Sequence, residues 1–129
     1  MASDDEYHFN DFMIKKTLTE VDVQPGNDYI MLSKEEVEEH IFKYWSHENI
    51  NTTKFEGMNF FAKDVDTNTD HIVKLRYYNG NPCSYGLSLV NFIERRSLRA
   101  GDMIGFYWNL NSISPVSRLC FRVLMKKFI

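Results

Sequence analysis

The strongest constraint on the fold is a pair of alternating segments separated by turn residues. In "HIVKLRYY" (residues 71–78) and "YGLSL" (residues 85–89), apolar side chains occupy every second position. Successive side chains of a β-strand point to opposite faces, so this period of two predicts two half-buried strands. Between them, the pair Asn79-Gly80 is a favoured hairpin turn. The two segments therefore predict an antiparallel hairpin.

Runs of apolar and β-branched residues predict the rest of a sheet. Phe106, in the apolar run "MIGFYW", is expected in the core of a central strand. The pair Pro25-Gly26 predicts a turn, because proline presets φ at the second turn position and glycine accepts a positive φ at the third. The polar segment "HENINTTKFEG" (residues 47–57) is expected to form a loop. The further strands are expected at residues 12–19, 29–33, 57–65, 101–108 and 118–125.

Two short helices complete the expected elements. Ser33 is an N-cap candidate for a helix over residues 34–42, and Glu36 completes a capping box that satisfies backbone N–H groups at the helix start. The segment "VNFIERR" (residues 90–96) predicts the second helix. Six or seven short strands with two short helices predict a small, mainly β barrel or sandwich.

Size and composition suit one compact domain. The chain has 129 residues, of which 43% are hydrophobic and 15% aromatic. Residues 1–11 are expected to form a disordered acidic tail, followed by a single domain over residues 12–129. No apolar run approaches the roughly 18 residues of a membrane span, so no membrane association is expected. Only Cys83 and Cys120 occur, without metal-type spacing, which predicts free thiols in a reducing, intracellular compartment.

Charge is asymmetric along the chain, although the net charge is only −3. Residues 1–39 carry eleven acids and three bases, whereas residues 71–129 carry nine bases and two acids. A basic face that binds an anion such as nucleic acid is compatible with this distribution. Mutual neutralisation of the two halves in the folded chain explains it equally well.

Three crowded arginines precede the apolar run "MIGFYW". Arg95, Arg96 and Arg99 are candidates for phosphate contacts, or for a solvated collar that pairs with the acidic helix at residues 34–42. The collar is the favoured interpretation, because charged residues at the rim keep an apolar barrel soluble.

No catalytic motif occurs in the sequence. Glu36 and His40 are four residues apart on one helical face, but a zinc-peptidase helix needs two histidines and a glutamate in a fixed order. A phosphate-binding glycine loop, a dinucleotide fingerprint and a nucleophile elbow are also missing. We therefore expect no enzyme, metal site, cofactor or small-molecule substrate.

The order of five segments resembles the plant B3 DNA-binding domain family, in particular its divergent, plant-expanded members. The resemblance covers nearly everything after residue 11. It implies a seven-stranded open β-barrel, the DNA-binding pseudobarrel, with two short helices. The matching segments are "KKTLTEVDV" (15–23), "IMLSKEEVEEHI" (30–41), "VKLRYY" (73–78), "SYGLSLVNFIERRSLRAGDMIGFYW" (84–108) and "RLCFRVL" (118–124).

In that family, two loops act as arms that straddle the DNA major groove. Arm amides can read base edges in a groove about 12 Å wide, while lysine and arginine neutralise phosphates. Lys15 and Lys16 lead into the first arm and Lys74 and Arg76 into the second, so these four are expected phosphate contacts. By the resemblance, the first arm comprises Gln24, Pro25, Gly26, Asn27 and Asp28, and the second Tyr78, Asn79, Gly80, Asn81, Pro82, Cys83 and Ser84.

Two functions remain open from the sequence. The first is a transcriptional regulator in the nucleus that binds double-stranded DNA sequence-specifically, with protein partners in a transcription complex. The second is a B3-like protein-interaction module without competent DNA contacts. Asp28 and the lack of an arm cation favour the second function, whereas the amides Gln24, Asn27, Asn79 and Asn81 favour the first.

Overall fold

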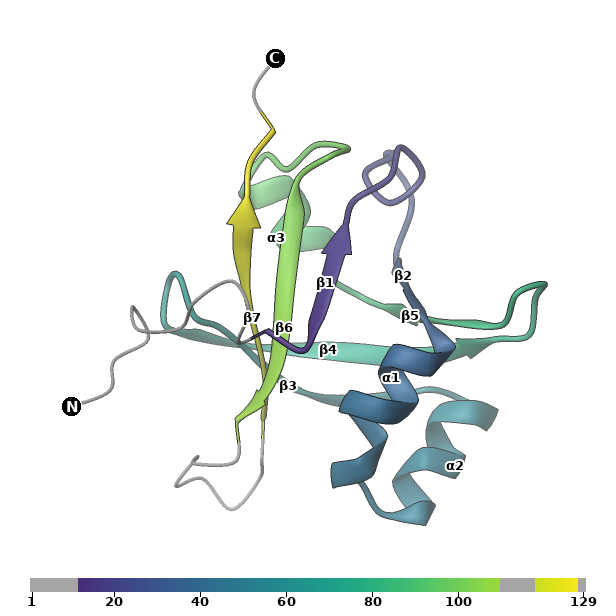
Figure 1. The fold of residues 1–129 in the computed structure, drawn as a ribbon. Helices are drawn as coiled ribbons and strands as arrows, with labels where there is room; N and C mark the ends of the chain where they lie inside the picture. The colour runs from purple at the N-terminus through teal and green to yellow at the C-terminus, as the bar shows by residue number, and fades with distance from the viewer. Residues whose placement is uncertain (1–11, 110–117, 128–129) are drawn as a thin grey trace.

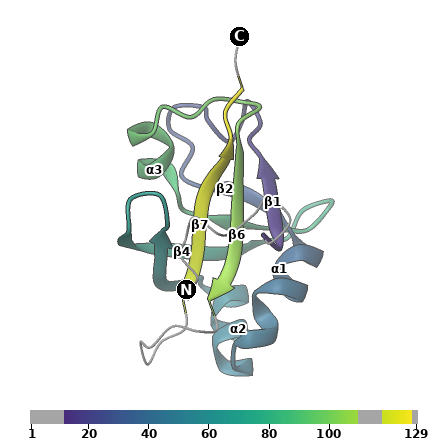
Figure 2. The same cartoon turned by 60° about the vertical axis from the view of Figure 1, so that its left-hand side comes forward.

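Seven strands form one sheet that curls into a nearly closed barrel (Figures 1 and 2). The computed structural model describes residues 12–109 and 118–127, so the predicted tail at residues 1–11 lies outside the described residues. The strand order is β1-β6-β7-β3-β4-β5-β2. Neighbours are antiparallel except β3 and β7, which are parallel. The strands are β1 Ile14–Thr17, β2 Ile30–Ser33, β3 Met58–Asp64, β4 Thr69–Tyr78, β5 Ser84–Leu87, β6 Met103–Asn109 and β7 Arg118–Met125.

The predicted mainly β, open seven-stranded barrel is therefore confirmed, with two differences in its elements. The first strand is shorter than the expected residues 12–19, because Leu18 already leaves the sheet. Three α-helices are present and not two: α1 Lys34–His40, α2 His47–Phe55 and α3 Val90–Arg95, with a short 3₁₀ turn, η3 Phe42–Tyr44. In Figures 1 and 2, α3 lies towards one end of the barrel, and α1 and α2 lie towards the other. No helix of the described ranges is long and apolar enough to span a bilayer.

The predicted N-cap of α1 is present, and Glu36 bonds back to the side chain of Ser33 rather than to its backbone N–H. The Ser33 hydroxyl accepts the backbone N–H of Glu36 at 3.1 Å and donates to the Glu36 carboxylate at 3.0 Å. Val37 and Ile41 are buried in the barrel. The helix ends at His40, two residues before the predicted end, where the chain tightens into η3.

The expectation of a loop at residues 47–57 is wrong, because residues His47–Phe55 form α2. Ser46 caps this helix by accepting the Asn49 N–H at 3.1 Å. The Thr53 hydroxyl donates to the Asn49 carbonyl at 2.9 Å, and Thr53 is the one buried residue of α2. The helix therefore lacks the apolar stripe by which an amphipathic helix is recognised in a sequence.

Aromatic and aliphatic side chains fill the barrel. Tyr85, Phe106 and Phe121 are the largest fully buried residues. Phe106 pairs with Ile14 on β1 and with Phe121 on β7, which confirms its place in a central strand. Phe92 of α3 packs edge-on against Phe121, with 4.8 Å between the ring centroids. The end of the barrel near α3 is thereby closed by an aromatic contact.

The turn before β6 ties three distant segments together. The Asp102 carboxylate is buried and accepts the backbone N–H groups of Arg99 at 2.8 Å and of Lys127 at 2.6 Å. The Asp102 carbonyl also accepts the N–H of Leu18 at 2.8 Å. Burial by itself would raise the pKa of Asp102, but the hydrogen bonds from Lys127 and Arg99 and the ammonium of Lys126 together lower it.

Among the described residues, the crowded arginines contact acidic and backbone groups of the barrel and not the acidic helix. Asp64 is fully buried at the end of β3, and the guanidinium groups of Arg96 and Arg95 lie 3.5 and 3.8 Å from its carboxylate. Arg96 also contacts Asp66 at 3.4 Å. Arg99 donates to the Lys127 carbonyl at 3.1 Å. These arginines therefore join α3 and the following turn to the rest of the barrel.

Candidate nucleic-acid interface

Two loops project from opposite ends of one three-stranded surface. We call residues 18–29, between β1 and β2, the first arm, and residues 79–83, between β4 and β5, the second arm. Strand β5 lies between β2 and β4 in the sheet. Ile30, which follows the first arm, pairs with Leu87, whereas Ser84, which follows the second arm, pairs with Ser33 and Tyr78. The outer surface of β2, β5 and β4 therefore lies between the arms, and in Figure 1 the first arm lies at the top and the second at the right.

The tip of the first arm is the predicted turn. The Asn27 N–H donates to the Gln24 carbonyl at 3.1 Å, which closes a four-residue turn with Pro25 second and Gly26 third. Gly26 has a φ of +88°, in the left-handed region that glycine tolerates. Gln24, Pro25 and Gly26 are all exposed, so the turn presents them to a partner.

The base of the first arm is organised by the buried carboxylate of Asp22. It accepts the Thr19 N–H at 2.8 Å, the Thr19 hydroxyl at 2.9 Å and the Met31 N–H at 3.2 Å. The ammonium of Lys16 lies 3.1 Å away, and the Lys16 side chain is only 18% exposed. Lys16 is thus engaged inside the arm. Lys15 has the opposite orientation, because neighbouring side chains of a strand alternate, and it lies opposite Gly105 of β6.

Asn27 also supports the arm internally. Its side-chain NH₂ group donates to the carbonyls of Tyr29 at 2.6 Å and of Asp22 at 3.2 Å. Both donors of this amide are therefore used inside the loop. Gln24 remains as the exposed amide of the first arm.

The second arm is held by its cysteine. The Cys83 thiol donates to the Gly80 carbonyl at 3.4 Å and to the Asn79 side-chain oxygen at 3.6 Å. A hydrogen bond with Cys83, together with burial, raises the pKa of Tyr77 at the base of this arm. Asn79, Gly80 and Asn81 are exposed. The predicted hairpin is confirmed, with residues 79–83 as its loop.

Two tyrosines join the arms across the surface between them. Tyr29 ends the first arm and Tyr78 precedes the second, and their rings meet edge to face with 6.0 Å between centroids. A Cβ added at Gly86 of β5 would lie 2.7 Å from Tyr78 Cε2 and 2.9 Å from Tyr29 Cβ. Gly86 thus leaves the space in which the rings pack. The guanidinium of Arg76 lies 5.5 Å from the centre of the Tyr78 ring.

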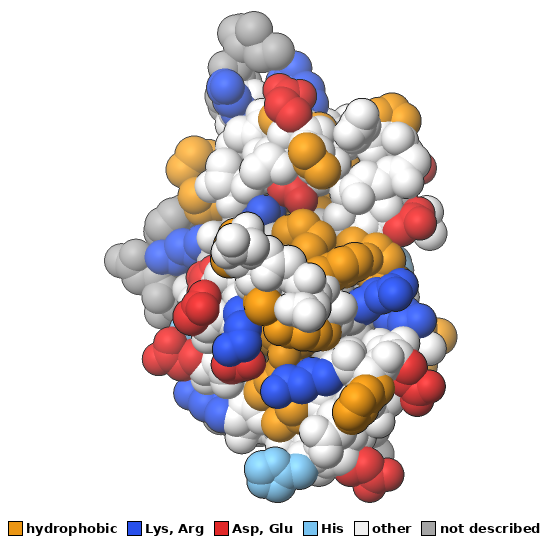
Figure 3. All heavy atoms as spheres, turned by 90° about the vertical axis from the view of Figure 1, so that its right-hand side faces the viewer, with side chains coloured by type: hydrophobic (Ala, Val, Ile, Leu, Met, Phe, Trp, Pro, Cys, Tyr) orange, Lys and Arg blue, Asp and Glu red, His pale blue; other side chains and the backbone are white. Residues whose placement is uncertain are grey.

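The remaining predicted contacts lie on this surface as well. Arg76 pairs with Gly86, and Tyr78 pairs with Ser84. Lys74 is two residues before Arg76 and shares its outward face, and its aliphatic chain lies over Gly57. Figure 3 views the molecule from the right-hand side of Figure 1, on which the second arm projects, and shows hydrophobic side chains flanked by lysine and arginine.

Asp28 lies in a polar hollow beside the first arm. This hollow of about 430 Å³ is also lined by Ser88, Asn91 and Arg95. The Arg95 side chain is 48% exposed, against 29% for that of Arg96. A cation therefore lines the same hollow as Asp28 of the first arm.

Sequence reasoning missed Tyr29 and Gly86 as parts of this surface, and for Arg95 it favoured a collar over a phosphate contact. A glycine in the middle of the alternating segment "YGLSL" was the available signal, since glycine within a strand often marks the close approach of another group. In the described residues, no group of three or more histidine, cysteine or acidic side chains is arranged to hold a metal ion.

Comparisons with known proteins agree with this architecture. The family model for the C-terminal domain of the B3 domain-containing protein At5g26805 matches residues 12–124. That Arabidopsis thaliana protein is 33% identical over 100 residues, which are 72% of this chain and 60% of its own length. The B3 domain-containing protein At4g02870 of the same plant is 30% identical over 113 residues, covering 88% of this chain and 34% of its own.

A further B3 domain-containing protein of Arabidopsis thaliana, At1g78640, is 37% identical over 120 residues, or 88% of this chain and 22% of the relative. The chain thus spans between about a fifth and three fifths of these relatives. Among solved structures, the Arabidopsis FUS3-DNA complex superposes with a TM-score of 0.69 and 26% identity, covering 90% of this chain and 97% of the other. From the family match and the shared fold, the chain belongs to the B3 domain family.

Proposed function

We propose that this B3 domain binds double-stranded DNA, with its two arms in the major groove, and acts in the nucleus as a transcriptional regulator. The observation that carries the proposal is the position of the arms at opposite ends of one outward surface with cations on it. The likeness to a structure solved as a complex with DNA supports it. A major groove about 12 Å wide admits such projecting loops.

Phosphate contacts are assigned to the outward cations. Lys74 and Arg76 lie on β4 between the arms, and Lys15 lies on the strand that leads into the first arm. Arg95 stands beside the first arm and adds a fourth cation at its flank. Such contacts fix the register of the domain on the duplex and carry no sequence information directly.

Base reading is assigned to the exposed arm amides. Gln24 of the first arm and Asn79 and Asn81 of the second are exposed, and side chains of this type bind adenine edges through paired hydrogen bonds. Pro25, Gly26 and Gly80 shape the arm tips and allow close approach of the backbone. Ser84 adds a hydroxyl at the base of the second arm.

Three residues from the predicted interface support the arms. Lys16 pairs with Asp22, the Asn27 amide bonds two carbonyls of its own loop, and Tyr78 packs on Tyr29. We assign them to holding the arms at a fixed separation. Loss of these contacts would weaken DNA binding through disorder of the arms and not through loss of a direct contact.

A protein-interaction module remains the second candidate. Asp28 is exposed on the first arm, and the arm's nearest lysine, Lys16, is already neutralised by Asp22. A carboxylate that enters the groove would be repelled by phosphates. This candidate predicts no measurable affinity for any duplex.

A selection from a randomised duplex pool at about 50 mM salt distinguishes the two functions. We expect enrichment of a short common motif, and we expect Asn79→Ala and Asn81→Ala to weaken binding to that motif more than binding to unselected duplexes. Lys74→Ala should weaken binding to all duplexes alike. If the pool shows no binding above background, the interaction module replaces the proposal.

A further inference from the structure

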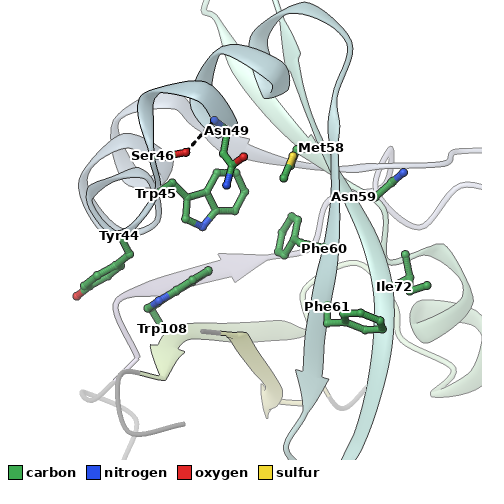
Figure 4. Close-up of a pocket in the computed structure, with 10 residues that line it drawn as sticks. All are labelled: Tyr44, Trp45, Ser46, Asn49, Met58, Asn59, Phe60, Phe61, Ile72 and Trp108. Atoms are coloured by element: carbon green, nitrogen blue, oxygen red, sulfur yellow. Dashed lines mark hydrogen bonds between the residues drawn. The ribbon is translucent and has the colours of Figure 1, made fainter. Parts of the chain in front are cut away.

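The first arm carries an exposed large hydrophobic side chain, that of Val21. Its exposed fraction is 61%, and both arms are described throughout, so it is the one residue of this kind on either arm. Elsewhere, Phe61 and Ile72 are exposed together beside a hollow that η3 and α2 also line (Figure 4). Single exposed hydrophobic residues are common on protein surfaces, so the role of Val21 depends on how the arm holds it.

Backbone hydrogen bonds hold Val21 and Gln24 at the two ends of one turn. The Gln24 N–H donates to the Val21 carbonyl at 3.2 Å. A turn of four residues closed in this way brings its first and last Cα atoms within about 7 Å of each other. The Val23 N–H also donates to the Thr19 carbonyl at 3.3 Å, which fixes the start of the turn. The backbone therefore sets the separation of Val21 and Gln24.

The two central residues of this turn face the protein, whereas the two end residues face outward. The side chain of Asp22 is buried and forms hydrogen bonds inside the arm. Val23 is half-buried and packs against the core. Val21 and Gln24 are both exposed. The turn therefore presents one apolar side chain and one amide side chain at the outside of the first arm.

An apolar group beside an amide matches the major-groove edge of an A·T base pair. A glutamine amide binds N7 and N6 of adenine through two hydrogen bonds, and the paired thymine directs its C5-methyl group into the same groove, where apolar side chains contact it. Successive base pairs are about 3.4 Å apart. Two side chains anchored within about 7 Å of each other therefore reach the same base pair or neighbouring ones.

We propose that Val21 is a specificity-determining residue, which recognises the C5-methyl group of a thymine at or next to the base pair that Gln24 reads. The inference rests on the proposed function, because it requires the first arm to lie in the major groove. Contact with Val21 removes the apolar surface of the methyl group from water, which adds affinity at one position of the DNA site. Phosphate contacts supply no such preference, because phosphates are the same in every sequence.

The amide of Gln24 distinguishes the two pyrimidines that carry this methyl group. 5-Methylcytosine has the methyl group at the same edge of the groove, but its partner is guanine. Guanine presents two acceptors, N7 and O6, whereas the amide offers one acceptor oxygen and one donor NH₂ group. The paired hydrogen bonds therefore form with adenine and not with guanine. Thymine is accordingly the source of the methyl group that we assign to Val21.

Replacement of thymine by deoxyuridine tests the proposal, because uracil pairs as thymine does but lacks the C5-methyl group. A duplex selected from the randomised pool is resynthesised with each thymine replaced in turn, and affinity is measured by fluorescence anisotropy. At one position we expect binding to weaken about fourfold, the effect of one buried methyl group. In Val21→Ser, the same replacement should change affinity by less than about 1.5-fold, since serine offers the methyl group no apolar surface.

Three further variants serve as controls. Val21→Ile keeps an apolar, β-branched side chain and should retain the loss of affinity with uracil. Met13→Ser removes an exposed hydrophobic residue that precedes β1, at the other end of this strand from the first arm, and should also retain it. Gln24→Ala should lose the preference for adenine over guanine at the same or the neighbouring base pair. Melting temperatures of all variants check that the barrel is intact.

Methylated duplexes distinguish the source of the methyl group. In a parallel series, each cytosine of the selected duplex is replaced in turn by 5-methylcytosine, and no position should gain affinity. A gain that disappears in Val21→Ser, without any effect of uracil, would overturn the assignment to thymine.

Failure of this inference differs from failure of the proposed function. If the selected duplexes bind but no uracil replacement weakens binding, Val21 contacts no thymine methyl group, while DNA binding stands. Equal losses with uracil in the wild type and in Val21→Ser would assign the methyl contact to another residue. If no duplex is bound at all, the proposed function fails, and the role of Val21 fails with it.

Discussion

Asp22 provides the sharpest test of how the first arm is built. Asp22→Ala removes the acceptor of two backbone N–H groups, those of Thr19 and Met31, and the partner of the Lys16 ammonium. An N–H left without a partner and without water costs about 1–3 kcal/mol. Thr19 is exposed, so water replaces part of the hydrogen bond that its N–H loses, whereas the N–H of the half-buried Met31 gains less from water. We therefore expect a loss of about 2–4 kcal/mol in the free energy of unfolding.

Urea denaturation measures this loss directly. For a chain of this length, about 2–4 kcal/mol corresponds to a fall in melting temperature of roughly 8–16 °C. Asp28→Ala is the matched control, because Asp28 is an exposed acid of the same arm, and it should change stability by less than about 0.5 kcal/mol. Amide exchange at Thr19 and Met31 should also accelerate in Asp22→Ala. A loss below about 1 kcal/mol, with exchange unchanged, would refute the assignment of Asp22 as the organiser of the arm.

Two further predictions concern the surface between the arms and the turn before β6. Gly86→Ala forces a Cβ against Tyr78 and Tyr29, so it should lower the free energy of unfolding, measured in urea, by about 1–3 kcal/mol. Gly80→Ala adds a Cβ with only an ordinary contact and should be nearly neutral. Equal losses of stability in the two variants would mean that the rings of Tyr78 and Tyr29 move freely. Asp102→Asn should destabilise the chain at neutral pH. Because the folded-state pKa of Asp102 is lowered, its contribution to the free energy of unfolding is present above the usual pKa near 3.8 and is lost as the pH falls through the folded-state pKa. The difference in melting temperature between wild type and variant should therefore narrow below about pH 4. A gap that is constant from pH 6 to pH 3 would contradict this.

Local patterns in the sequence were sufficient for the elements that depend on near neighbours. The alternation at residues 71–78 predicted most of β4, the capping pair Ser33 and Glu36 predicted the start of α1, and Pro25-Gly26 predicted the turn of the first arm. Each of these structures is determined by residues within one strand, one helical turn or one β-turn. The pattern is therefore visible without knowledge of the fold.

Helix α2 could not be predicted in the same way. Its stabilising contacts are the Ser46 cap and hydroxyl bonds such as that of Thr53, and these residue types are also typical of loops. Thr53 is its one buried residue and Ile50 is partly buried against the core, so no apolar period is present. Packing beside β3 and β4, which forms only in the folded chain, determines its state.

The candidate interface was only partly predictable for a related reason. The arms were located by resemblance, but the engagement of Lys16 and Asn27 within the first arm depends on Asp22 and its neighbours in space. The contact between Tyr29 and Tyr78 exists only because β2 and β4 both flank β5. Charge and residue type alone therefore predicted four phosphate contacts on two strands, whereas the structure leaves Lys16 paired inside the protein.

The most direct test of the proposed interface is the salt dependence of DNA affinity. Four cations, Lys15, Lys74, Arg76 and Arg95, predict a slope of about −3.6 for log affinity against log salt, at about −0.9 per phosphate. Arg76→Ala should make the slope shallower by about 0.9, while Lys43→Ala, an exposed cation that lies over the Tyr44 ring beside Trp108 of β6, should leave it unchanged. A slope near zero, or equal changes in Arg76→Ala and Lys43→Ala, would contradict a DNA interface on the surface between the arms.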